Sequence, residues 1–126
     1  MPTSYRIDRQ QRLVITTAVD TFNLADGLAH QEKLAQDPDF DPNFSQIMDF
    51  TRVNAVGLKA EDVRKLAQRT IFSPESRRAI IVSTDVLYGF ARMFEILREN
   101  YGENGIRVFR AFDEALHWIL SKNLAA

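Results

Sequence analysis

Two groups of polar residues in this chain combine the carboxylate, hydroxyl and guanidinium side chains that bind an anion or a polar head group. The first group begins at the end of residues 45–50, SQIMDF, and the second follows the apolar run at residues 79–82, AIIV. The members are Asp49, Thr51, Arg52, Ser83, Thr84, Asp85 and Tyr88. Because ligands of parallel sheets bind outside the carboxyl ends of the strands, the sequence predicts a ligand pocket lined by these residues.

The second group also has a simpler interpretation. The stretch DVLYGFARMFE, residues 85–95, reads as the start of a helix directly after a buried strand. The first N–H groups of a helix are free to bind either an anion or a capping side chain. Thr84 or Asp85 is a suitable N-cap, and a carboxylate at Asp85 would already satisfy those N–H groups.

Alternating strand and helix patterns place these residues in an α/β fold. Strands are predicted at residues 5–8, 12–17, 45–50, 79–82 and 106–110, and helices at 24–36, 60–70, 86–101 and 112–121. The order β-β-α-β-α-β-α-β-α predicts a mostly parallel sheet with an antiparallel first strand. A chain of this length suits one core, so residues 1–126 are predicted to form a single domain.

The helix at residues 86–101 can be projected at about 100° per residue. Its predicted inner face comprises Val86, Phe90, Met93, Phe94, Leu97 and Tyr101. Tyr88, Arg92, Glu95 and Glu99 fall on the outer face. Arg92 is therefore expected to stack on Tyr88 and to form an ion pair with Glu95.

Gly89 is an unfavourable residue inside this helix, since glycine costs about 1 kcal/mol relative to alanine there. Close approach of another group is the usual reason for such a glycine. Gly89, Arg92, Met93 and Ile96 are therefore predicted to form a contact seam. The partner is either a neighbouring element of the same chain or a second subunit, which would make the protein a homodimer.

Composition excludes several classes of function. The chain has no cysteine, which rules out disulfides, zinc–thiolate sites and cysteine nucleophiles. Sixteen basic and seventeen acidic residues give a net charge of −1, which argues against nucleic acid as a partner. The segment MPTSYRIDRQQRLV lacks the apolar core of a signal peptide, and no apolar run reaches about 18 residues. A cytoplasmic protein without an integral membrane segment is expected.

No catalytic, metal or cofactor site is predicted. The segment DPDFDPNF, residues 37–44, begins like a calcium loop, but Pro42 stands where glycine is needed and Met48 where glutamate is needed. His30 and His117 are expected on helix surfaces, away from any nucleophile. The sequence therefore favours a protein that is not an enzyme.

Several segments resemble the bacterial SpoIIAA-like proteins, which share a fold with STAS domains and with CRAL-TRIO lipid-transfer domains. The similar segments are YRIDRQQRLVITT, DPDFDPNFSQIMDF, DVRKLA, SRRAIIV, YGFARMFE and VFRAFDEALHWI. Anti-sigma antagonists of the STAS group carry a phosphorylated serine in a motif like Asp-Ser-Ser-Gly. Here residues 54–57, NAVG, occupy that place, and Thr51 is the nearest hydroxyl.

The resemblance implies a SpoIIAA-like fold and a non-enzymatic protein-interaction or regulatory module without the phosphorylation switch. The lipid-transfer relatives suggest an alternative. In that case the chain would bind a small apolar or anionic, lipid-like ligand at the carboxyl ends of the strands.

Overall fold

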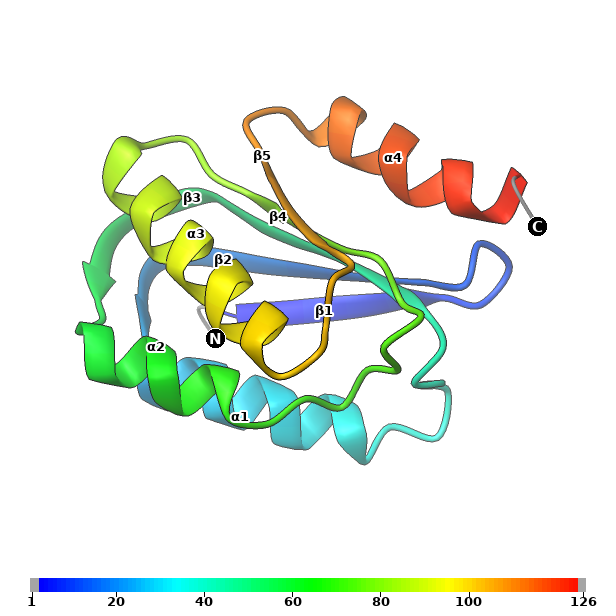
Figure 1. The fold of residues 1–126 in the computed structure, drawn as a ribbon, viewed down its shortest axis with the longest axis horizontal. Helices are drawn as coiled ribbons and strands as arrows, with labels where there is room; N and C mark the ends of the chain where they lie inside the picture. Colours follow the sequence, from blue (N-terminus) through cyan, green and yellow to red (C-terminus); the bar gives the residue numbers. More distant parts are fainter. Residues whose placement is uncertain (1–2, 125–126) are drawn as a thin grey trace.

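The computed structural model of the chain describes residues 3–124, with the side chains of residues 3–122 (Figure 1). The strands are β1 (Thr3–Asp8), β2 (Leu13–Asn23), β3 (Ser45–Gly57), β4 (Arg78–Ile81) and β5 (Ile106–Phe109). The helices are α1 (Leu24–Ala35), α2 (Ala60–Ala67), α3 (Asp85–Asn100) and α4 (Phe112–Leu124). Among the described helices, none is both long and apolar enough to cross a membrane.

The strands form one sheet in the order β1-β2-β3-β4-β5. Strand β1 pairs antiparallel with β2, and all the other neighbouring strands are parallel. The predicted α/β class, the order of elements and the antiparallel first strand are therefore confirmed. Asn23 caps α1, since its side chain accepts a hydrogen bond from the Asp26 N–H while the Asp26 side chain accepts one from the Asn23 N–H.

Strands β2 and β3 extend well beyond the predicted ranges of 12–17 and 45–50. Their pairing contains register shifts between Thr17 and Val19 and between Asp20 and Thr21, and Asp20 has a φ of 64°. A bulge breaks the alternation of inward and outward side chains. The second halves of both strands consequently lack the period of two that predicts a strand from sequence.

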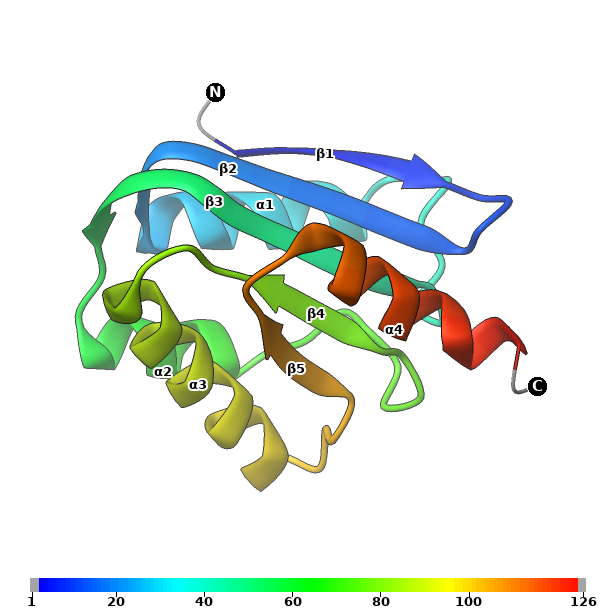
Figure 2. The same ribbon diagram turned by 90° about the horizontal axis from the view of Figure 1, so that it is seen from above.

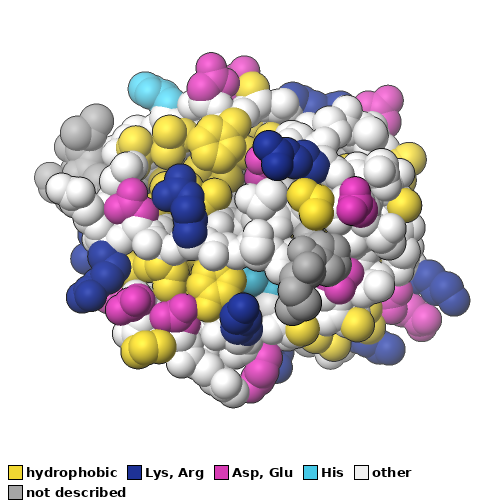
Figure 3. All heavy atoms as spheres, turned by 180° about the vertical axis from the view of Figure 1, so that it is seen from behind, with side chains coloured by type: hydrophobic (Ala, Val, Ile, Leu, Met, Phe, Trp, Pro, Cys, Tyr) yellow, Lys and Arg dark blue, Asp and Glu magenta, His cyan; other side chains and the backbone are white. Residues whose placement is uncertain are grey.

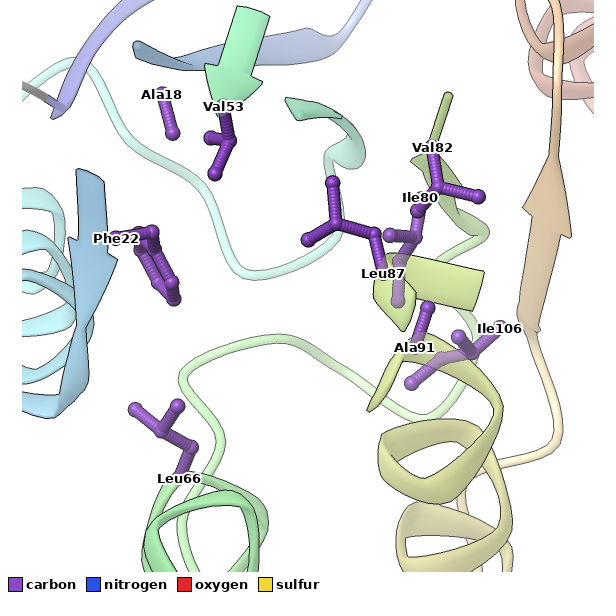
Figure 4. Close-up of a cluster of buried hydrophobic side chains, with 9 residues drawn as sticks. All are labelled: Ala18, Phe22, Val53, Leu66, Ile80, Val82, Leu87, Ala91 and Ile106. Atoms are coloured by element: carbon purple, nitrogen blue, oxygen red, sulfur yellow. The ribbon is translucent and has the colours of Figure 1, made fainter. Parts of the chain in front are cut away.

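Helices cover both faces of the sheet. In Figure 1, α4 lies above the sheet, while α1 and α2 lie below it; Figure 2 shows the same layers from above. On the α4 side, Leu13, Ile47 and Ile81 pack with Ala115 and Ile119. The larger cluster on the other side is drawn in Figure 4 and comprises Ala18, Phe22, Val53, Leu66, Ile80, Val82, Leu87, Ala91 and Ile106.

Helix α3 packs with a different face inward from the one predicted. Its buried residues are Leu87, Ala91, Glu95 and Arg98. Val86 and Tyr101, predicted to be in the core, are 64% and 58% exposed. The apolar projection failed because two charged side chains lie on the inner face. Arg98 is buried with an acidic partner, and this pairing decides how the helix is rotated.

Gly105 lies immediately before β5 and is tightly enclosed. A Cβ atom there would stand 2.3 Å from the Ser76 carbonyl oxygen, which is backbone and cannot move aside cheaply. We therefore expect Gly105→Ala to lower the free energy of unfolding by about 1–3 kcal/mol. A Cβ at Gly89 would meet no atom within 4 Å, so Gly89→Ala is the matched control.

The control variant Gly89→Ala should raise the free energy of unfolding by up to about 1 kcal/mol, because alanine is more favourable than glycine inside a helix. Urea unfolding at protein concentrations that keep the chain monomeric measures both variants. Equal stability of the two variants would contradict the enclosed position of Gly105.

Candidate functional site

The structure brings the two predicted polar groups together at the carboxyl end of β4. The Ser83 hydroxyl donates to the Thr51 carbonyl oxygen at 3.4 Å. Oδ1 of Asp49 accepts from the Thr51 N–H at 2.9 Å and from the Thr51 hydroxyl at 2.6 Å. Arg52 lies farther along β3, opposite Val19. This part of the predicted pocket is a hydrogen-bonded strand end in which Thr51, Arg52 and Ser83 are exposed.

The start of α3 satisfies its own polar groups. Thr84 is the N-cap and accepts a hydrogen bond from the Leu87 N–H at 3.2 Å. The Asp85 side chain is 97% exposed and pairs with Arg110 at 2.9 Å. Arg110 also lies over the Tyr88 ring, 5.0 Å from its centre. Six of the seven predicted residues thus occupy open surface, Asp49 is half-buried, and ligand binding by them stays a prediction.

A cavity of about 100 Å³ lies elsewhere, between the sheet and helices α1, α2 and α3. Its wall is mostly apolar, with Met48, Phe50 and Ile80 on the sheet side and Leu66 and Ala91 on the helix side. Oxygens of Thr3 and Gln31, both on this wall, are buried and have no hydrogen-bond partner among the described residues. None of the seven predicted pocket residues lines this cavity.

A directional chain of hydrogen bonds forms the polar part of the cavity wall. Arg78 Nε donates to Gln46 Oε1 at 3.1 Å, which orients the amide so that its Nε2 donates to Thr16 Oγ1 at 3.0 Å. The Thr16 hydroxyl lies 3.1 Å from His30 Nε2. Gln46 Nε2 also lies 3.4 Å from His30 Nε2, and since an amide nitrogen only donates, Nε2 of His30 is the acceptor in this network and the Thr16 hydroxyl donates to it. A neutral His30 therefore carries its proton on Nδ1.

The series of hydrogen bonds that runs from Arg78 to His30 begins at a buried ionic cluster. Nη1 of Arg78 lies 3.1 Å from one carboxylate oxygen of Glu103, and Nε of Arg98 lies 2.8 Å from the same oxygen. Arg98 also donates to the Ala67 carbonyl oxygen at 2.6 Å. All three charged residues are buried, at 5%, 5% and 3% exposure. Burial lowers the pKa of Arg78, and the Glu103 carboxylate partly offsets that effect.

The end of α3 positions the acid of this cluster. Gly102 has a φ of 92°, a conformation that suits glycine just after a helix. The Glu103 N–H returns to the Arg98 carbonyl at 3.0 Å, which closes the cap and places the Glu103 side chain against Arg98. The helix ends within one residue of the predicted range 86–101, and the turn at Gly102 also aligns the ionic cluster.

His30 was predicted on the surface, and this prediction is wrong. It lines the cavity, and the pKa of its imidazole is lowered to about 4, first by burial and then by the positive charges of Arg78 and Lys33. His117 is exposed as predicted. The missed signal is the set Gly27, His30, Gln31 and Leu34, whose spacing of three, one and three residues forms one helix face.

The acidic loop at residues 37–44 binds back onto the fold. The Tyr5 hydroxyl donates to Asp37 Oδ2 at 2.7 Å. Burial, with this carboxylate beside it, raises the pKa of Tyr5 to about 12. Phe40 packs edge-on against Phe72, and Phe44 is buried. No group of three or more potential metal ligands occurs among the described residues.

No protein-family model matches the chain, and no curated protein matches it. A similar solved structure is that of an uncharacterized protein from the DUF3478 family with a SpoIIAA-like fold, from Shewanella loihica PV-4. It is 22% identical, with a TM-score of 0.59 over 93% of this chain and 93% of that chain. The fold of the present chain is SpoIIAA-like, as the sequence predicted.

Among the described residues, Glu103 is the acid that contacts both buried arginines, so its charge is expected to matter more than that of a surface glutamate. Glu103→Gln should lower the free energy of unfolding by about 3–5 kcal/mol, because it leaves two buried cations unpaired. Glu99→Gln removes the same charge from an exposed position on α3 and should change it by less than about 0.5 kcal/mol. Urea titrations at neutral pH compare the two, and a similar loss in both would contradict the role of the buried carboxylate.

The neutral state of His30 predicts a pH dependence of stability. The folded pKa, about 4, lies below the ordinary value of 6.5, so the unfolded chain binds the proton more readily between these values. Stability should therefore fall as the pH drops below about 6.5, with a loss of about 2 kcal/mol at about pH 5 relative to pH 7.5. His30→Gln should remove most of this dependence, whereas His117→Gln should leave it unchanged. Unfolding measured at both pH values checks all three proteins.

Proposed function

We propose that this chain of SpoIIAA-like fold is a non-enzymatic interaction module of the cytoplasm that pairs with a second copy of itself through the outer surface of α3. The observation that carries the proposal is where its exposed apolar side chains lie. Five large hydrophobic residues are exposed among the described residues, namely Val86, Tyr88, Ile96, Tyr101 and Phe112. The first three belong to α3, and Tyr101 is its C-cap.

An apolar strip runs along α3 directly opposite its buried face. It consists of Val86, Gly89, Met93 and Ile96, and we call it the α3 strip. The spacing of three, four and three residues keeps these positions within one side of the helix. The same spacing is symmetric about its midpoint. A two-fold axis midway between Gly89 and Met93 would place Val86 of one copy against Ile96 of the other.

The same axis would place Met93 of each copy against Gly89 of the other. Apart from its chain neighbours and its own helix backbone, no described residue has an atom within 4 Å of a Cβ position at Gly89, so close approach by the described part of this chain does not account for that glycine. A long, flexible methionine from a second copy would use the open space. Two-fold contacts of this self-complementary kind are the commonest in soluble oligomers.

Charged groups border the α3 strip, as expected at the rim of an interface. Arg92 pairs with Glu95 at 2.8 Å, as the sequence predicted. The predicted stacking of Arg92 on Tyr88 is replaced by stacking of Arg110 on the Tyr88 ring. Arg92 is therefore held beside the strip, and its charge is already paired.

The sheet edges are less suited to pairing. Strand β1 is an edge strand with Arg6 exposed, and β5 is only four residues long. The view from behind, on the β1 side, shows hydrophobic side chains in patches between charged ones (Figure 3). Charges and short length are the usual means by which edge strands avoid pairing with another chain. These features support α3 as the contact surface.

The proposal assigns no phosphorylation switch. Residues 54–57, NAVG, end strand β3, and the nearby Thr51 hydroxyl is already bonded to Asp49. The alternative function, binding of a small apolar or anionic ligand at the carboxyl ends of the strands, remains a second hypothesis. It is supported by the clustering of Asp49, Thr51 and Ser83 there.

The α3 strip predicts a specific effect of charge. Ile96→Arg should abolish self-association, because a guanidinium group would be buried against Val86 of the other copy at each end of the contact. Phe112→Arg places the same charge at an exposed aromatic residue outside α3 and should leave association unchanged. Sedimentation velocity or native mass spectrometry of the wild-type chain and both variants measures subunit number. A monomeric wild-type protein at all accessible concentrations would overturn the proposal.

A further inference from the structure

The cavity between the sheet and helices α1, α2 and α3 contacts a buried excess of positive charge. Arg78 and Arg98 share one carboxylate, that of Glu103, and all of the ion pairs of these two arginines with described residues are to Glu103. A buried cation without a counter-ion is costly. The excess charge reaches the cavity through Arg78, which lines its wall.

Arg78 retains unused hydrogen-bonding capacity. Its Nε donates to Gln46 and its Nη1 to Glu103, whereas Nη2 makes no hydrogen bond with a described residue. The guanidinium lies 4.7 Å from the centre of the Phe72 ring and 5.6 Å from that of Phe94. These rings attract the cation, but they do not neutralise it.

The other ionisable group on the cavity wall nearby supplies no negative charge. His30 is neutral, and hydrogen bonds through Thr16 and Gln46 connect it to Arg78. An anion entering the cavity would therefore meet an unopposed guanidinium in a mostly apolar enclosure, where a charge-assisted hydrogen bond is strong.

The cavity has a polar, positively charged end and an apolar end. Gln46 and Arg78 are opposite each other in the β3–β4 pairing, Met48 and Ile80 come two residues later, and Phe50 follows. The polar end thus lies toward the amino ends of the parallel strands, and the apolar body extends toward their carboxyl ends. Figure 4 shows part of this body, with Phe22 and Leu66 on one side of the cluster and Leu87 and Ala91 on the other.

We propose that the cavity binds a small monocarboxylate, with its carboxylate at Nη2 of Arg78 and a short alkyl chain against Met48, Ile80 and Ala91. The volume of about 100 Å³ sets the size of the chain. An engineered apolar cavity of about 150 Å³ holds benzene, which has six non-hydrogen atoms, so this smaller cavity has room for about four or five non-hydrogen atoms in all, the carboxylate included, as in propanoate.

Propanoate and its neutral isostere propanamide test the charge. Isothermal titration calorimetry of the wild-type chain at constant ionic strength should show propanoate binding about tenfold or more tightly than propanamide. Equal affinity of the two compounds, or no binding of propanoate, would overturn the proposal. Octanoate binding more tightly than propanoate would overturn the assigned chain length.

Two variants locate the site. Ala91→Leu fills the apolar body and should lower propanoate affinity about tenfold or more, while circular dichroism confirms that the variant is folded. Unchanged affinity in this variant would place the ligand elsewhere. Arg78→Met, if folded, should bind propanoate no better than propanamide, and a retained preference would contradict the role of Arg78.

The Ile96→Arg variant separates this inference from the proposed pairing. Ile96 lies on the opposite side of α3 from Ala91, so this variant should keep wild-type affinity for propanoate whether or not it self-associates. Loss of propanoate binding in the Ile96→Arg variant would contradict a ligand site on the inner side of α3. The pairing and the ligand site can therefore fail independently.

Discussion

The shared ion pairing of Arg78, Glu103 and Arg98 determines much of this structure. It connects the first residue of β4, the last turn of α3 and the segment that follows α3. Through the Ala67 carbonyl it also reaches the end of α2. Buried charges require well-defined geometry, because a displaced partner leaves a desolvated charge behind. The cluster therefore fixes the relative positions of elements that apolar packing alone would leave free to shift.

The rotation of α3 follows from this cluster. Burial of Arg98 brings Ala91 and Leu87, about two and three turns earlier, against the sheet. The opposite side of the helix is then turned outward, and its apolar residues Val86 and Ile96 are left exposed. The rotation of α3 that buries Arg98 in the ionic cluster therefore also exposes the apolar strip on the opposite side of the helix.

The sequence predicted the order of elements because that order depends on local signals. The apolar run before Ser83, the cap at Asn23 and the stop at Gly102 each lie within a few residues. The face of α3 and the polar cavity wall were not predictable in this way. Thr16, Gln46 and Arg78 are separated along the chain and meet only through strand register, which the residue pattern does not determine. The available signal was a polar residue inside a predicted strand, such as Gln46. By itself, such a residue does not indicate which side chains of the neighbouring strands it will contact.

The two ends of the sheet differ in how far their polar groups are satisfied. At the carboxyl end of β4, the N-cap Thr84 serves the helix, and Asp85 is paired with Arg110. Toward the amino ends, Arg78 keeps an unused donor and the cluster keeps an uncompensated charge. The rule that ligands bind at the carboxyl ends of parallel strands rests on free helix N-termini gathered there. In this chain the capped helix removes that advantage, whereas a buried guanidinium creates an attractive site for an anion at the other end.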